Sequence, residues 1–195
     1  MAKYRWLFAT NNRHKLEEAR LILAPFAEIC SLNDLGIEAE VEESGSTFLE
    51  NARLKAEAYS SISGLPCFAD DSGLCVEALK GAPGVHSARF AGEPCNHELN
   101  NAKLLAELEH SGNRAAHFHC CIATVGLAKG NPHFEGRVYG SIGLTLAGHL
   151  GFGYDPLFIP DTYSETFAQL GPDVKNRLSH RALALQQMAE SLISS

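Results

Sequence analysis

The sequence lacks long hydrophobic runs and an excess of basic residues. None of its apolar runs approaches the roughly 20 residues of a membrane-spanning helix. The chain has 16 Lys and Arg residues against 23 Asp and Glu residues, which gives a net charge of −7. A general nucleic-acid coat needs a basic surface, so this balance argues against nucleic acid as a partner. It leaves room for a small anionic ligand in a locally basic pocket.

The six cysteines contain no Cys-x-x-Cys pair. We therefore expect reduced, partly buried thiols. The run His117-Phe118-His119-Cys120-Cys121 resembles a zinc cluster, but in a strand its side chains alternate between two faces. Three ligands from one flat strand rarely complete a tetrahedron, so a strand crossing the core is favoured over a zinc site.

The first residues, Met1 to Trp6, lead into an apolar strand and show no signal-peptide cleavage region. A cytoplasmic, soluble protein is therefore expected. With 195 residues, 45% of them hydrophobic, the chain can bury one substantial core. There is no repeat, low-complexity linker or clear boundary, so residues 1–195 are predicted to form a single domain.

Strand-like and helix-like segments alternate along the chain. Asn12 is a candidate cap for a first helix that stops before Pro25, and residues 47–50 form a capping box for a second. The remaining helices are expected near residues 102–108, after a start at Asn96 or Asn100, and from a cap at Ser179 to residue 193. Strands are expected at residues 4–9, 27–30, 67–70, 74–79, 117–127 and 133–146.

The central feature is the stretch at residues 68–74, in which Asp70, Asp71 and Ser72 follow an apolar run. Adjacent carboxylates at the end of a strand commonly hold a metal ion. Turn chemistry alone favours a simpler reading, an Asp-Asp-Ser-Gly turn between two strands. The stretch by itself favours the turn over the metal site.

A second polar segment joins the first strand to the first helix and contains Thr10, Asn11, Asn12, Arg13, His14 and Lys15. Free backbone N–H groups at a helix start attract anions, and these side chains add donors and positive charge suited to phosphate. The segment lacks the glycines of a Walker loop. An ordinary Asn cap followed by a solvent-facing Lys explains it equally well.

Glu42 and Glu43 precede the helix that carries Lys55. Magnesium uses few protein carboxylates together with water and substrate phosphates, so one Glu here and one Asp from residues 70–71 would suffice. A solvated acidic loop is the competing reading. Lys55 shares a helical stripe with Phe48, Asn51 and Tyr59, so it either snorkels to solvent or points into a site.

Two further stretches suit a nucleotide. Gly151 and Gly153 flank Phe152, followed by Tyr154 and Asp155; such glycines allow close backbone approach, and Phe can stack on a base. A structural aromatic turn is the alternative. Lys175 precedes the last helix, and His180 and Arg181 lie in its first turn, where cations oppose the helix dipole at a small cost. An electron-rich ligand or plain solvent exposure would explain that cost.

Together these stretches fit a Mg²⁺–nucleotide site better than a Ser-His-Asp or Cys-His hydrolase. They do not choose which bond is cut.

At these residues the chain resembles the inosine triphosphatase (Ham1-like) family of pyrophosphatases, which act on non-canonical purine nucleoside triphosphates. Six motifs carry the resemblance in order along nearly the whole chain: T-N-N-R-H-K at 10–15, E-E-S-G-S-T-F-L-E-N-A-R-L-K at 42–55, F-A-D-D-S-G-L at 68–74, G-A-P-G-V-H-S-A-R-F at 81–90, G-F-G-Y-D-P at 151–156 and S-H-R at 179–181. The region from Glu93 to Arg114 is not diagnostic.

The resemblance implies a fold: an α/β protein with a long, strongly bent mixed β-sheet flanked by helices, in two lobes around a central active-site cleft. It also implies a homodimer and hydrolysis of ITP, dITP or XTP to the monophosphate and pyrophosphate.

The resemblance also implies residue roles. Glu43 and Asp71 would bind Mg²⁺, and Asp71 would accept the proton of the attacking water, with Asp70 in support. Residues 10–15 and Lys55 would hold the triphosphate, and Ser72 would touch the substrate. The nucleotide pocket would contain Phe152, stacked on the base, with Gly153, Tyr154, Asp155, Lys175, His180 and Arg181.

Donors on His180 and Arg181 suit a 6-oxo purine and oppose adenine's amino group. A Maf-type pyrophosphatase with another base preference and a non-catalytic nucleotide-binding module are the rival hypotheses. The S-H-R and G-F-G-Y-D-P motifs argue against the first, and the presence of both Asp70 and Asp71 argues against the second.

Overall fold

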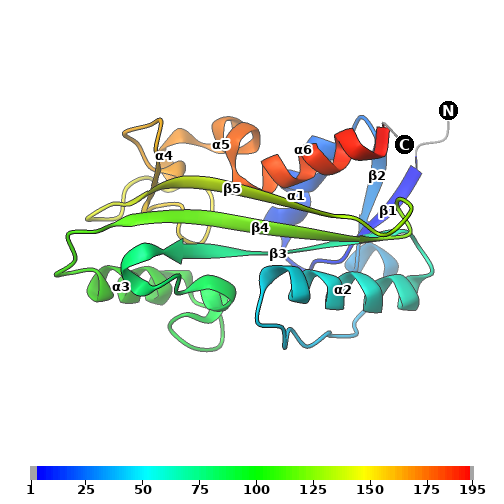
Figure 1. Cartoon of the computed structure of the whole chain (residues 1–195), viewed down its shortest axis with the longest axis horizontal. Helices are drawn as coiled ribbons and strands as arrows, with labels where there is room; N and C mark the ends of the chain where they lie inside the picture. Colours follow the sequence, from blue (N-terminus) through cyan, green and yellow to red (C-terminus); the bar gives the residue numbers. More distant parts are fainter. Residues whose placement is uncertain (1–3, 194–195) are drawn as a thin grey trace. The chain divides into compact units, whose positions relative to one another are not determined.

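The computed structural model describes residues 4–193 (Figure 1). Residues 1–3, on which part of the expectation about a signal peptide rests, lie outside this range. The strands are β1 (Tyr4–Phe8), β2 (Ala27–Ser31), β3 (Cys67–Val76), β4 (Ala115–Val125), β5 (His133–Ile142) and β6 (Phe158–Pro160). The α-helices are α1 (Arg13–Leu23), α2 (Phe48–Ser63), α3 (His97–Glu107), α4 (Phe167–Leu170), α5 (Pro172–Leu178) and α6 (His180–Ile193).

The six strands form one mixed sheet in the order β2-β1-β3-β4-β5-β6. Strand β1 pairs in parallel with both β2 and β3, whereas β5 and β6 are antiparallel. The α/β class and the mixed sheet predicted from the sequence are therefore confirmed. The strong bend of the sheet, the two lobes and the cleft stay predictions.

The chain divides into two compact units. Unit 1 contains residues 1–71, 120–136 and 181–195, and unit 2 contains residues 72–119 and 137–180. The boundaries fall inside β3, β4 and β5, so these strands contribute residues to both units. The prediction of a single domain stays a prediction.

Unit 1 is built on the alternation of side chains along β1. Trp6 and Phe8 belong to a buried cluster with residues of α1 and α6, while Leu7 and Ala9 belong to a second cluster with residues of α2. Successive side chains of a strand point to opposite faces, so β1 has a helix layer on each face. Figure 1 shows α1 and α6 on one side of these strands and α2 on the other.

Unit 2 has one buried cluster. It combines Leu74 of β3, Leu104 of α3, Phe118 of β4 and Phe167 of α4. The Phe118 and Phe158 rings lie 4.8 Å apart at 59°, a tilted arrangement typical of packed aromatic residues.

Local sequence signals set the starts of three helices. Asn12 caps α1 and Asn96 caps α3, each by accepting backbone N–H bonds. Thr47 and Glu50 form the reciprocal capping box of α2, as predicted. For α3 the structure selects Asn96 and makes Asn100 a buried residue of the second turn.

One prediction about the central stretch was wrong. Residues 68–74 contain no turn, because β3 runs without interruption from Cys67 to Val76. Phe68, Ala69, Asp70 and Asp71 are all buried in this strand. Turn chemistry is a local preference, and here the buried charges have partners on both faces of the sheet, which makes an extended conformation tolerable.

Other segments also differ from the expectation: the strand predicted at residues 133–146 ends at Ile142, and the short strand β6 was not predicted. Residues 77–79, predicted to continue a strand, form a short 3₁₀ turn. Helices α4 and α5 were not predicted; they are short, and α5 begins with Pro172, a residue favoured in the first helical turn. Lys175 therefore lies on a helix rather than in a connecting segment.

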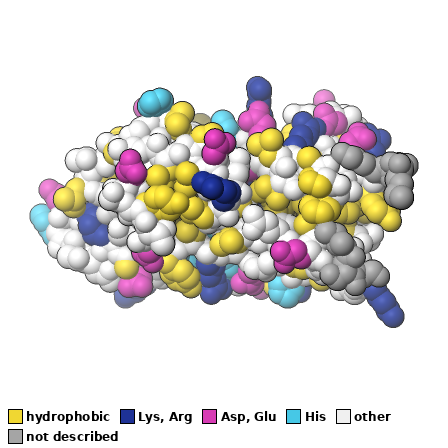
Figure 2. All heavy atoms as spheres, turned by 90° about the horizontal axis from the view of Figure 1, so that it is seen from above, with side chains coloured by type: hydrophobic (Ala, Val, Ile, Leu, Met, Phe, Trp, Pro, Cys, Tyr) yellow, Lys and Arg dark blue, Asp and Glu magenta, His cyan; other side chains and the backbone are white. Residues whose placement is uncertain are grey.

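Figure 2 shows one face of the molecule, where acidic and basic side chains lie among patches of hydrophobic ones. Within residues 4–193, no helix is long and apolar enough to cross a membrane.

Candidate active site

Asp70 lies on the face of β3 that packs against α1 and α6. Both of its carboxylate oxygens are 3.1 Å from Nζ of Lys15, and Oδ2 accepts a 3.0 Å hydrogen bond from Nε of Arg181. The thiol of Cys120 lies 3.8 Å from the same oxygen. Arg181 also donates through Nη1 to Glu18 of α1. Asp70 is thus the centre of a buried charge network.

This network sets the protonation of its members. Burial raises the pKa of Asp70, but the positive charges of Lys15 and Arg181 outweigh burial and hold that pKa well below its usual range. Burial lowers the pKa of Arg181, yet Asp70 and Glu18 more than compensate. Asp70 is therefore ionised at neutral pH, and a carboxylate with so low a pKa is a poor proton acceptor.

Asp71 points to the other face of β3, where α2 packs. Its Oδ2 accepts a 3.0 Å hydrogen bond from Nδ2 of Asn51. Burial raises the pKa of Asp71, and the attraction of Lys55 and Lys15 only partly opposes this increase. A buried carboxylate with a raised pKa is better matched to proton transfer near neutral pH than its neighbour Asp70.

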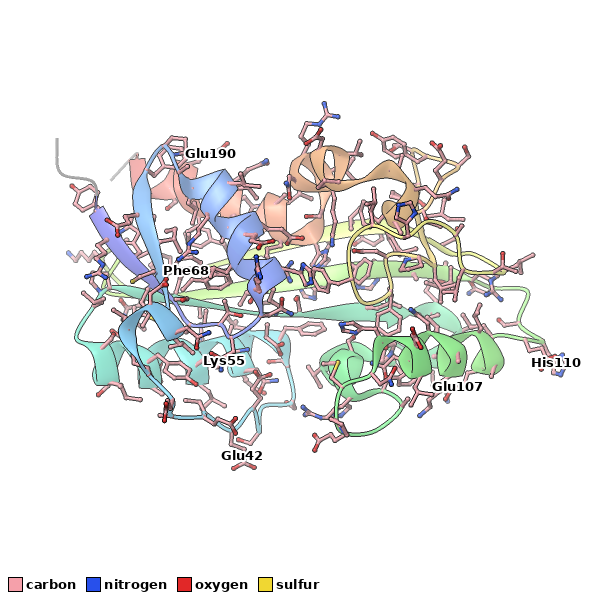
Figure 3. All side chains as sticks on the ribbon, turned by 180° about the vertical axis from the view of Figure 1, so that it is seen from behind. Glu42, Lys55, Phe68, Glu107, His110 and Glu190 are labelled. Carbon is pink, nitrogen blue, oxygen red and sulfur yellow. The ribbon has the colours of Figure 1, made fainter. Side chains whose placement is uncertain are left out.

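Lys55 and Glu43 form an ion pair near Asp71. The Lys55 Nζ lies 2.8 Å from Oε1 of Glu43. Burial lowers the pKa of Lys55, but Asp71, Glu43 and Asp70 raise it by more, so the ammonium group stays charged. Of the two predicted readings of Lys55, the structure supports a side chain directed into a site. Figure 3 shows Lys55 on α2 and Glu42 on the loop before it, with Glu42 pointing away from the strands.

Asn51 connects the acidic loop to Asp71. Its Oδ1 accepts a 2.8 Å hydrogen bond from the Gly45 backbone N–H while its Nδ2 holds Asp71. A Cβ on residue 45 would lie 2.7 Å from Oδ1 of Asn51, so glycine is required there. The sequence predicted only that Asn51 lies on a helical stripe. Its hydrogen-bond partners, Gly45 and Asp71, could not be predicted.

The donor chemistry fits a hard divalent cation. Glu43 and Asp71 both supply carboxylate oxygens, and the negative charge of Glu43 contributes to the raised pKa of Asp71. Carboxylate oxygen is the ligand type that Mg²⁺ prefers. These two residues could therefore hold such an ion, whereas Asp70 is already neutralised by its cations.

The segment at residues 10–15 is a capped helix start. Oδ1 of Asn12 accepts from the N–H groups of His14 and Lys15, at 3.0 and 3.2 Å, and Oγ1 of Thr10 accepts from Asn12 N–H. Asn11, Arg13 and His14 are exposed. The cap reading is thus confirmed, but Lys15 does not face solvent, since it binds Asp70.

In unit 2 the Gly-rich stretch forms a compact loop around Asp155. The Asp155 Oδ2 accepts a 2.8 Å bond from the Phe152 backbone N–H and a 2.7 Å bond from Nζ of Lys175. The same Nζ lies 4.3 Å from the centroid of the half-buried Phe152 ring. A Cβ at Gly151 would lie 2.1 Å from Oδ2 of Asp155, so only glycine fits. Buried Tyr154 donates to the Ser87 carbonyl at 2.9 Å.

His180 and Arg181, which are adjacent in the S-H-R motif, belong to different units. His180 is buried in unit 2 with its ring stacked on Phe118, 4.8 Å between centroids. Arg181 is buried in unit 1, in the Asp70 network. Neither is solvent-exposed, so that explanation for their position at the helix start is wrong. Ser72 is half-buried in β3, at the start of unit 2.

Three residues of unit 1 were not predicted as site residues: Glu18, Asn51 and Cys120. Glu18 follows Lys15 by one helical turn on α1, a spacing that offered the only sequence signal. Cys120 offered none, because its contact with Asp70 joins strands 50 residues apart.

Unit 1 of this α/β protein contains two buried carboxylates whose pKa values are shifted in opposite directions, with lysine and arginine side chains held against them. Unit 2 contains an aromatic loop with its own ion pair. The Ham1 family matches residues 6–191. A protein of Porphyromonas gingivalis named dITP/XTP pyrophosphatase is 48% identical over 188 residues, covering 96% of each chain. One of the same name from Listeria monocytogenes is 43% identical over 190 residues, covering 96% of this chain and 94% of the other.

Solved structures agree. A HAM1 protein from Coxiella burnetii has a TM-score of 0.90 at 36% identity, covering 98% of this chain and all of the other. The Staphylococcus aureus Ham1 protein has a TM-score of 0.88 at 38% identity, covering 97% and 98%. The chain therefore belongs to the Ham1 family, which confirms the resemblance drawn from the six motifs.

Proposed function

We propose that this protein hydrolyses non-canonical purine nucleoside triphosphates, such as ITP, dITP and XTP, to the monophosphate and pyrophosphate. The names of its relatives support this enzyme class. The observation that carries the mechanism is Asp71, a buried carboxylate whose pKa burial raises, beside the Lys55 ammonium. Water supplies the nucleophile: its oxygen bonds to the α-phosphorus, the bond to the bridging α–β oxygen breaks, and Asp71 accepts the water proton.

The triphosphate would be held by Lys15, Lys55 and the polar residues of segment 10–15. Both lysines stand among carboxylates, so each brings positive charge into a site otherwise rich in negative charge. Phosphoryl transfer depends mainly on positioning and on neutralising oxygen charge, which two fixed ammonium groups assist. Ser72 would add a hydroxyl contact to the substrate.

Glu43 and Asp71 are the residues that would hold Mg²⁺, with substrate phosphates and water completing its ligands. When bound, such an ion supplies positive charge to the phosphate oxygens. The chain's own part is to keep both carboxylates in place, which Lys55 does for Glu43 and Asn51 does for Asp71.

The purine would stack on Phe152 in unit 2. Lys175 and Asp155 fix this loop through their ion pair, and Gly153 and Tyr154 complete it. His180 and Arg181 are proposed to donate to the 6-oxo group, which adenine lacks. We further propose a homodimer, a cytoplasmic location and a single domain of two lobes.

The reaction is tested by incubating the protein with ITP, dITP, XTP, ATP and GTP in the presence of Mg²⁺, with pyrophosphate and monophosphate as products. Hydrolysis in ¹⁸O-labelled water should place the label in the monophosphate. Label in pyrophosphate would move the attack to the β-phosphorus. Absence of turnover with every triphosphate would reject the enzyme function, and preference for ATP or GTP over ITP, dITP and XTP would favour the Maf-type alternative with another base preference.

A further inference from the structure

Two adjacent asparagines on α3, Asn100 and Asn101, are both buried in unit 2, at 2% and 5% exposure. They lie in the region that carries no diagnostic motif. A buried side-chain amide has to be hydrogen-bonded or it costs stability. The two residues differ in how far this requirement is met.

Asn100 uses both ends of its amide. Its Nδ2 donates to the carbonyl oxygens of Ala88 at 3.0 Å and Ser87 at 3.4 Å, and its Oδ1 accepts from Ala91 N–H at 2.7 Å. All these partners belong to the 84–91 segment, so Asn100 fastens α3 to that segment. Its role is explained by stability.

Asn101 uses one end only. Its Nδ2 donates to the Gly153 carbonyl oxygen at 3.0 Å, but its Oδ1 is buried with no hydrogen-bond partner among residues 4–193. An unsatisfied buried acceptor costs at least as much stability as a single neutral hydrogen bond contributes. A side chain that gains so little for stability calls for another explanation.

The partner of Asn101 lies in the loop proposed to bind the purine. Gly153 follows Phe152 directly and has a positive φ of 63°. It has no side chain, and no heavy atom outside its chain neighbours lies within 4 Å of where a Cβ would be. The hydrogen bond from Asn101 ties the backbone of Gly153 to α3. His97, one helical turn before Asn101, lies near the Phe152 ring, with 6.4 Å between centroids.

We infer that Asn101 is a positioning residue for the nucleobase: by holding the Gly153 carbonyl it fixes the backbone that sets the direction of the Phe152 ring. This inference rests on the proposed function, in which Phe152 stacks on the purine. It assigns a role to α3 in base selection. It also explains why the Asn101 side chain, whose amide has a hydrogen-bond partner at Nδ2 only, lies in the core of unit 2.

The test compares Asn101→Leu with Asn100→Leu, a matched pair of nearly isosteric changes on one helix. Asn101→Leu removes one bond and one unsatisfied acceptor, so its Tm should stay within about 2 °C of the parent or rise. Its KM for ITP should rise about tenfold with kcat within about twofold, because ground-state and transition-state binding fall together. The ITP-to-ATP ratio of kcat/KM should fall. Asn100→Leu should lower Tm by several degrees.

A KM for ITP and an ITP-to-ATP ratio that stay at the parent values in Asn101→Leu would overturn the inference, whatever its Tm. Binding of inosine monophosphate, followed by ligand-observed NMR, provides a readout without turnover. If the parent protein hydrolyses no triphosphate, the proposed function fails. Weaker inosine monophosphate binding in Asn101→Leu than in the parent would still support the role of Asn101, and equal binding would overturn it.

Discussion

Asp70 and Asp71 are neighbours in the chain but serve opposite faces of β3. Asp70 faces α1 and α6, where two cations neutralise it and keep its pKa low. Asp71 faces α2, where one amide donates to it and burial raises its pKa. Strand geometry makes the difference, since adjacent side chains point to opposite faces. One carboxylate thus stabilises the fold, and the other is available for chemistry.

The sharpest test of this contrast is Asp71→Asn. We expect kcat to fall by about 10²–10⁴-fold, the usual contribution of a positioned base. The free energy of unfolding should not fall, because the neutral amide avoids the cost of burying a charge. Steady-state kinetics and urea denaturation measure the two effects, with the exposed Asp173→Asn as a control. A variant that keeps most of its activity would remove Asp71 from the role of proton acceptor.

Asp70→Asn should have the opposite signature. It removes the Asp70 carboxylate from both buried Arg181 and Lys15, so we expect a loss of about 3–5 kcal/mol of unfolding free energy. Removing one member of a buried charge network is costly, so Asp70→Asn combined with Arg181→Met should be less destabilised than the sum of the single variants. Equal denaturation midpoints for Asp70→Asn and the parent would contradict the network.

Asn51→Ala tests the link between the acidic loop and Asp71. It removes the bond to Asp71 and leaves the Gly45 N–H without its acceptor. We expect a loss of about 1–3 kcal/mol of stability and a lower kcat, since the carboxylate loses its fixed orientation. Thermal denaturation and kinetics measure both. An unchanged kcat would show that Asn51 is purely structural.

The two carboxylates should also give opposite pH dependences in metal-free protein. The pKa of Asp71 is raised on folding, so its contribution to stability falls as pH rises from the unfolded pKa, near 4, through the folded value. The pKa of Asp70 is lowered, so its contribution is present above about pH 4 and is lost as pH falls toward the folded value.

Urea denaturation from pH 3 to 8 can separate these contributions. The parent protein should lose stability relative to Asp71→Asn as pH rises above about 4. A constant difference across this range would refute the raised pKa of Asp71.

The smallest expected effect is that of Thr47→Ala on α2. This change breaks the capping box that starts the helix, with a cost of about 1 kcal/mol. Because the α2 face carries Asn51 and Lys55 in later turns, kcat should change little. A large loss of activity would mean that the helix start itself positions the site.

Much of the fold could be predicted because its signals are local. The caps at Asn12 and Thr47 and the strand predicted at residues 4–9, observed at residues 4–8, each depend on a few neighbouring residues. The turn predicted at residues 70–73 was wrong. Local preference favours a turn there, but Asp70 and Asp71 bind partners that are distant in the sequence, and β3 runs through these residues. Helices α4 and α5 were too short to show a period.

The candidate site was likewise predicted only in part. The sequence indicated its chemical types, which are carboxylates at Glu43, Asp70 and Asp71, cations at Lys15 and Lys55, and an aromatic loop at residues 151–155. The partners of these groups could not be predicted, because contacts such as Arg181 with Asp70 join residues 111 positions apart.

The caps at Asn12 and Thr47 and the six motifs typical of the Ham1 family can be recognised in the sequence alone, because each depends on neighbouring residues. The different roles of Asp70 and Asp71 follow from the tertiary structure. An isolated Asp-Asp pair is chemically symmetrical; the strand turns one side chain toward Lys15 and Arg181 and the other toward Asn51. Burial and nearby charge, which depend on packing, then set their pKa values in opposite directions.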